Sequence, residues 1–206
     1  MSGILRIGVL ACAVWAVAAW AAQLRGAGAF GRRTSWAAPA RPAWRGVAYA
    51  FGPGMSPWAK ESVRDHLPAY FAGVAYHAGI FAALLLLGAS VMGVGLGGAW
   101  RAGVGFLAAL GAAAGTVLLV RRARSPLLRA ISSPDDYVSN LLTTAVLALA
   151  FARTLVPAAE GALFAGGMLL LLWAPVGKIR HCLFFFVTRA SSGAFFGRRG
   201  VFPPAA

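Results

Sequence analysis

The sequence predicts an all-α fold, an integral membrane bundle of five transmembrane helices. Hydrophobic residues make up 60% of the chain and charged residues only 12%, whereas soluble domains are about half apolar and a quarter charged. The apolar residues gather into five long runs. The basic residues lie between these runs and are concentrated in alternate connections, which is typical of a multi-pass membrane protein.

Five segments can each be drawn as a helix that crosses the hydrocarbon core, which takes about 20 mostly apolar residues. They are residues 3–23, 67–95, 102–120, 137–155 and 161–188. The second is entered after the polar stretch AKESVRDH, and the fourth after SSPDD, where Ser133 and Pro134 predict a helix start. Small residues crowd the third (GVGFLAALGAAAG), which predicts close helix packing. Strands of a membrane barrel would alternate apolar and polar residues, and runs such as FAALLLLGA and GGMLLLLWA do not.

The charge of the connections predicts the orientation. Sixteen of the 19 cations fall on one side: in residues 24–65, in the connection after the third segment and near the end of the fifth. Only Arg6, Arg101 and Arg153 fall on the other. Because cytoplasmic connections carry the excess of Lys and Arg, the N-terminus is predicted outside and the C-terminus in the cytoplasm. Residues 24–65 then form a cytoplasmic basic loop, and residues 189–206 a cytoplasmic tail, of one membrane domain.

The composition argues against three other classes of protein. A net charge of +14 would suggest nucleic-acid binding in a soluble protein, but no soluble basic face is predicted here to carry it. Cys12 and Cys182 form neither a CxxC motif nor a four-ligand zinc pattern, so structural zinc and iron–sulfur sites are not expected. No charged residue lies near the middle of a segment and no internal repeat is found, which argues against a transporter.

Two of the three histidines lie within predicted spans. His77 is about 18 Å of helix from Asp65, and His181 is about 12 Å from Arg189. The two helices run in opposite directions, so both histidines are predicted at comparable depth in the cytoplasmic half. Two imidazoles at one level can ligate a haem iron axially. The alternatives are a buried histidine bonded to a nearby carbonyl for His77 and an interfacial histidine for His181.

Three further residues are candidates. Lys178 and Arg180 flank His181, and these cations could bind haem propionates or anchor the helix end at the membrane surface. His66 lies at the mouth of the second segment, eleven residues before His77 and on the same helical face. It is interpreted as an interfacial residue, with quinone contact or unusual ligation as alternatives. With three histidines, at most one haem can have two histidine ligands.

Several stretches together resemble a known family. They are YHAGIFAALLLLG, RRARSPLLRAISSPDDY and GKIRHCLFFFVTRASSGAFFGRRGVFPP. From about residue 60 onward the chain is similar to the gamma subunit of respiratory nitrate reductases. It is more similar to relatives of that subunit in quinone-linked respiratory complexes, including the membrane cytochromes of dissimilatory sulfur metabolism.

The resemblance implies a membrane cytochrome b of the bacterial cytoplasmic (inner) membrane. It implies His77 and His181 as the axial ligands of one haem b, the haem nearer the cytoplasm. The ligand pair of a second, outer haem corresponds here to Leu87 and Leu163, so that haem is expected to be lost. The implied partners are membrane lipid, iron–sulfur or other redox subunits on the cytoplasmic face, and other membrane or cytochrome c subunits.

The predicted function is electron transfer between the quinone pool and a peripheral redox subunit. The chain would act as a haem-containing subunit of an oxidoreductase complex rather than as a stand-alone enzyme. A haem-free structural anchor of such a complex is the alternative, and the pair of histidines at matched depth argues against it.

Overall fold

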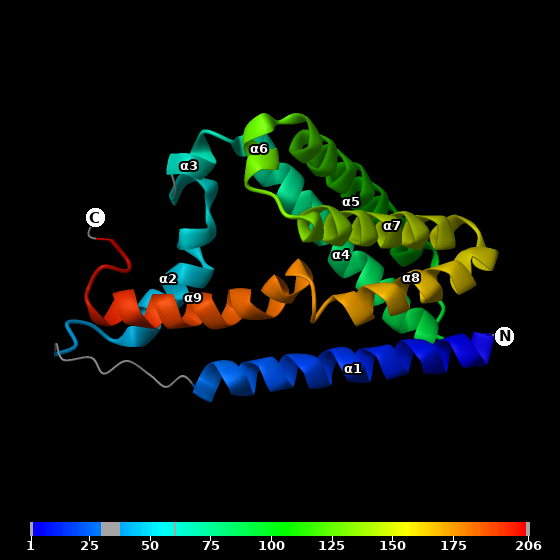
Figure 1. Cartoon of the computed structure of the whole chain (residues 1–206), viewed down its shortest axis with the longest axis horizontal. Helices are drawn as coiled ribbons and strands as arrows, with labels where there is room; N and C mark the ends of the chain where they lie inside the picture. Colours follow the sequence, from blue (N-terminus) through cyan, green and yellow to red (C-terminus); the bar gives the residue numbers. More distant parts are fainter. Residues whose placement is uncertain (1, 30–37, 60, 205–206) are drawn as a thin grey trace. The chain divides into compact units, whose positions relative to one another are not determined.

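The chain is helical in the computed structural model, which describes residues 2–29, 38–59 and 61–204 (Figure 1). No strand occurs among these residues, so the all-α prediction is confirmed. The chain divides into two compact units: unit 1 consists of Met1–Ala19 and Pro68–Ile179, and unit 2 of Trp20–Leu67 and Arg180–Ala206. Within the predicted basic loop, Arg32, Arg33 and Lys60 lie outside the described residues.

Unit 1 is built from long helices. They are the first part of α1 (Ser2–Ala29), α4 (Leu67–Val91), α5 (Gly98–Arg124), α7 (Pro134–Leu155) and α8 (Glu160–Trp173), with the short α6 (Pro126–Ala130) and the 3-10 turn η3 (Pro157–Ala159) between them. The helices α1, α4, α5 and α7 are each long and apolar enough to cross a membrane, which agrees with the first four predicted segments. The second ends four residues early, because Gly93 takes a φ of +71° and turns the chain out of the helix.

The fifth predicted segment, residues 161–188, is not one continuous helix. Instead α8 ends at Trp173, the 3-10 turn η4 covers Lys178–Arg180, and α9 runs over His181–Arg198. The predicted tail 189–206 is therefore largely helical. Taken together the two halves form one broken candidate span, so the described residues contain four candidate spans, or five with this pair.

A local turn separates the two halves. Pro175 has no N–H with which to continue a helical ladder. The N–H groups of Val176 and Gly177 both turn back to the carbonyl of Trp173, at 3.0 and 2.8 Å. Gly177 packs so closely on the indole of Trp173 that a Cβ at this position would collide with it. Proline and glycine in the stretch WAPVGK thus end α8.

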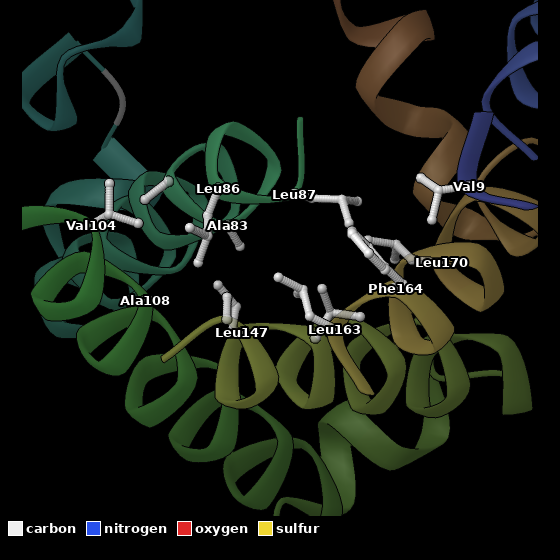
Figure 2. Packing of buried hydrophobic residues seen from close by; sticks show 13 residues of the cluster. Val9, Ala83, Leu86, Leu87, Val104, Ala108, Leu147, Leu163, Phe164 and Leu170 are labelled. Atoms are coloured by element: carbon white, nitrogen blue, oxygen red, sulfur yellow. The ribbon is translucent and has the colours of Figure 1, made fainter. Parts of the chain in front are cut away.

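The core of unit 1 draws on four helices, with Val9 added from α1 (Figure 2). Phe164, Leu147 and Leu163 are fully buried, and Leu87 is 4% exposed in the same cluster. Leu87 and Leu163 occupy the positions at which the resemblance places the ligands of an outer haem. Both are packed core residues here.

Close helix packing in unit 1 depends on glycine, as the small residues of the third segment predict. A Cβ at Gly79 of α4 would lie 2.7 Å from the Gly111 Cα and from the Leu107 carbonyl oxygen of α5. Gly115, one turn after Gly111, faces Tyr76 and Thr144 in the same manner. The small residues let helix backbones approach, which is the usual way for helices to pack within lipid.

Ion pairs lie at both ends of α7. At its start, Asp136 contacts Lys178 at 2.5 Å and Arg122 at 3.5 Å. At its end, Arg153 contacts Glu160 at 2.9 Å, and Arg6 of α1 lies 3.7 Å from the same carboxylate. Asp136 and Arg153 are about 25 Å apart along the helix, close to the ~30 Å of a hydrocarbon core. The charges therefore lie where the boundaries of a spanning helix are expected.

Unit 2 contains a helix within residues 24–65, which the sequence predicts as a loop. It is α2 (Ala43–Phe51), followed by the 3-10 turns η1 (Pro53–Met55) and η2 (Pro57–Ala59) and by α3 (Glu61–Arg64). α2 lies antiparallel along α9 (Figure 1). Gly46 of α2 packs directly on Gly193 and Gly197 of α9, with no room for a Cβ at any of the three.

Candidate functional site

His77 lies within α4, as predicted, and its ring has a defined tautomer. Its Nδ1 lies 2.7 Å from the carbonyl oxygen of Gly73, one turn earlier. Because a carbonyl oxygen only accepts, Nδ1 carries the proton and the lone pair of the neutral ring is on Nε2. Histidines that ligate metals commonly donate their other N–H in this way, which fixes the orientation of the ring.

The His77 side chain is exposed rather than buried. It shares a face of α4 with Val74 and Phe81, which are 50% and 68% exposed. Tyr76 lies on the adjoining face and points into unit 1, where its hydroxyl lies 3.1 Å from the carbonyl oxygen of Asn140. His77 therefore lies on the outer, apolar face of α4. Its bond to the Gly73 carbonyl is the one that the alternative of a structural histidine expects, whereas the burial which that alternative expects is not found.

Space is available beside His77. A Cβ built on Gly73 would meet nothing within 4 Å, so the surface one turn before the histidine is open. A planar macrocycle needs such an open apolar surface next to its axial ligand, because the ring extends several ångströms from the iron. The residues around His77 thus fit a haem.

His181 is the first residue of α9 and is exposed. The sequence placed it inside a long fifth helix, and the turn at residues 174–177 puts it at a helix start instead. The helix is continuous from His181 to Arg189, so the two residues are about 12 Å apart along its axis, as predicted. His77 belongs to unit 1 and His181 to unit 2, so their pairing stays a prediction.

Lys178 has a protein partner. Its Nζ donates to Asp136 Oδ2 at 2.5 Å, which ties η4 to the first turn of α7. The Asp136 carboxylate also accepts from the Ser133 N–H at 2.8 Å, which is half of a capping box at the helix start that Ser133 and Pro134 predict. The cation proposed for a haem propionate thus neutralises a carboxylate of the chain, while Arg180 is exposed at the N-cap of α9.

His66 lies just before α4 begins. It is exposed, and its backbone N–H donates to the carbonyl of Val63 at 3.0 Å. This is the position at the mouth of the helix that the sequence predicts. Neither a quinone contact nor ligation by His66 is tested by this geometry.

Unit 2 contains a pocket that the sequence reading missed. It encloses about 380 Å³ between α2, η2 and α9, and aromatic and hydroxyl side chains line it, among them Tyr49, Thr188, Ser192 and Phe196. Arg189 also lines the pocket and donates to the carbonyl oxygens of Ala50 and Gly54, at 2.6 and 2.9 Å. The glycines of GAFFG in α9, four residues apart, were a sequence signal that α9 packs on another helix.

Among the described residues, no group of three or more His, Cys, Asp or Glu side chains is placed to hold a metal ion. Axial ligation of a haem needs only two side chains, so this observation does not bear on His77 and His181. No family model, curated protein or solved structure matches the chain.

Proposed function

We propose that the chain is a membrane cytochrome b subunit that carries electrons between the quinone pool and a peripheral redox subunit. The observation that supports it most is the hydrogen bond from His77 Nδ1 to the Gly73 carbonyl oxygen. This bond holds the imidazole in the tautomer that an axial ligand needs, on an open face of an apolar helix.

In this proposal His77 and His181 hold one haem b, which supplies one-electron redox chemistry when bound. The chain itself contributes the axial nitrogens, an apolar surround and nearby cations, which are the means by which a protein adjusts a haem potential. Arg180 remains a candidate for a propionate contact, whereas Lys178 would have to be shared with Asp136. Leu87 and Leu163 are packed in the core, which supports one haem rather than two.

The partners follow from the same proposal. A peripheral iron–sulfur or other redox subunit would dock on the basic side that the charge distribution predicts as cytoplasmic, where complementary charge could steer an acidic surface. Other membrane or cytochrome c subunits could complete the complex. The predicted location is the bacterial cytoplasmic membrane, and the apolar helices are consistent with contact to its lipid.

The test is the optical spectrum of the purified full chain, reduced minus oxidised. His77→Ala and His181→Ala are each expected to abolish the α band of haem b, whereas the control His66→Ala is expected to keep it. Circular dichroism of the three variants checks that each remains helical. Retention of the band in both ligand variants would refute the assignment. A wild-type chain without haem after gentle purification would favour the structural anchor.

A further inference from the structure

The α2–α9 pair of unit 2 carries an exposed aromatic flank, which consists of Trp44, Phe51 and Phe186. Trp44 and Phe51 are seven residues apart and so share one face of α2. The Phe51 ring stacks on that of Phe186, with centroids 6.1 Å apart and an interplanar angle of 17°. Trp44 is 66% and Phe186 59% exposed, so the flank presents two large rings to the surroundings.

The pocket of unit 2 borders this flank at Phe185, which lines the pocket and meets the Phe51 and Phe186 rings edge-on. Tyr49 also lines the pocket and stands about 200° around α2 from Phe51. The Tyr49 ring contacts Phe202, with centroids 5.1 Å apart. Ser192 of α9 lines the same pocket and is exposed. The α2–α9 pair therefore has two surfaces of different character that meet at Phe185: the aromatic flank and a partly polar hollow.

A cation accompanies the aromatic flank. The guanidinium of Arg45 lies over the Trp44 ring, 5.7 Å from its centroid. Arg41, exposed just before α2, instead donates to the carbonyl oxygen of Pro203 at 3.4 Å. By sequence, unit 2 contains eleven of the 19 Lys and Arg residues of the chain but only two acidic residues, Glu61 and Asp65. A surface that combines exposed tryptophan with arginine is typical of segments that lie at the boundary between a membrane and water.

The chain path keeps unit 2 close to the membrane. The boundary between the units falls within α1, at the start of α4 and within η4. α1 and α4 are both long and apolar enough to span a membrane. A unit joined at these points to spanning helices stays within reach of the lipid surface. An acidic protein, the other partner that a basic flank could bind, would have to be recruited from solution.

We propose that the aromatic flank of unit 2 lies in the headgroup region of an anionic phospholipid bilayer. Trp44 and Phe186 enter the boundary with the acyl chains, and Arg45 contacts lipid phosphates. Anionic lipid satisfies both features at once, because stable attachment to a membrane surface takes buried apolar area together with a basic patch. The proposal does not depend on haem binding.

The test uses the full chain in nanodiscs, with a fluorophore on a single engineered cysteine after Cys12→Ala and Cys182→Ala. Ala48→Cys reports on the aromatic flank, because residue 48 is exposed one turn after Trp44. Ser192→Cys on the pocket flank is the matched control. In discs of phosphatidylglycerol, a spin label near the lipid headgroup is expected to quench residue 48 several-fold more than residue 192. Iodide in solution is expected to quench residue 192 more than residue 48.

Two further arms make the outcome decisive. Trp44→Ser, or replacement of the anionic lipid by phosphatidylcholine, is expected to remove most of the difference between the two positions. If iodide strongly quenches residue 48 in the chain that keeps Trp44, in phosphatidylglycerol discs, the flank is solvated and the proposal is overturned. Shielding of residue 48 from both quenchers would show that protein, such as a second copy of the chain, covers the flank, and would also overturn it. Loss of haem ligation leaves this experiment unaffected.

Discussion

Lys178 Nζ lies 2.5 Å from Asp136 Oδ2, and this pair joins the break in the fifth predicted span to the start of α7. The Asp136 side chain is only 12% exposed and that of Lys178 50% exposed. The same carboxylate caps α7 and lies 3.5 Å from Arg122. One acidic residue thus serves a helix cap and two cations.

Asp136→Ala is therefore expected to destabilise unit 1 more than Lys178→Ala. Loss of the capping-box bond should cost about 0.5–2 kcal/mol, as for other helix caps, whereas loss of the half-exposed lysine should cost about 0–1 kcal/mol. Thermal unfolding in detergent measures both, with Arg180→Ala as the control for an exposed cation nearby. If Lys178→Ala instead left the unfolding midpoint unchanged and shifted the haem potential, a propionate contact would be the better role for this lysine.

A second connection to the same break runs through Trp173. Its Nε1–H donates to Ser139 Oγ at 3.0 Å, and that hydroxyl donates to Asp135 Oδ1 at 2.7 Å. Ser139 is 8% exposed, so Ser139→Ala should leave a poorly solvated indole N–H without its acceptor. We expect a loss of about 1–3 kcal/mol in unfolding free energy. Ser191→Ala, at an exposed position of α9, should change it little; equal effects of the two substitutions would contradict this account.

At the opposite end of α7, one carboxylate serves two arginines. Glu160 accepts from Arg153 at 2.9 Å and lies 3.7 Å from Arg6. Glu160→Gln removes the charge but keeps the shape, so two cations remain close together without a counter-charge. We expect about 1 kcal/mol of destabilisation, and a smaller effect in high salt because screening weakens such pairs. Arg101→Gln is the control, and a salt-independent loss would point to lost packing instead.

Much of the fold could be predicted because hydropathy and charge act over long stretches. The first four spans follow from runs of about 20 apolar residues, and the start at Ser133 follows from local capping chemistry. The break in the fifth predicted span depends on whether Pro175 and Gly177 end a helix or only bend it. Packing decides this, through the contact between Gly177 and the Trp173 indole, and hydropathy does not register it.

The candidate site could be predicted only in part. That His77 lies within a helix follows from hydropathy, but its exposure depends on how α4 is rotated against α5 and α7, and its bond to Gly73 depends on the side-chain rotamer. The ion pair of Lys178 joins residues 42 positions apart and had no local signal. Leu87 and Leu163 illustrate the same limit, since only the fold brings these apolar residues into one core.

The contact of α2 with α9 gives the last prediction. Gly46 meets the backbone of Gly193 and Gly197 directly, so any side chain at these positions must push the two helices apart. Gly193→Leu is expected to disrupt the pair and to expose the arginines of unit 2 to trypsin, since overpacking costs about 1–3 kcal/mol and backbone contacts cannot yield as side chains can. Limited proteolysis of the full chain in nanodiscs measures the rate of cleavage. Gly26→Leu is the matched control, because a Cβ there meets nothing within 4 Å. Cleavage at the same rate in both variants would show that the close contact is not what holds α2 on α9.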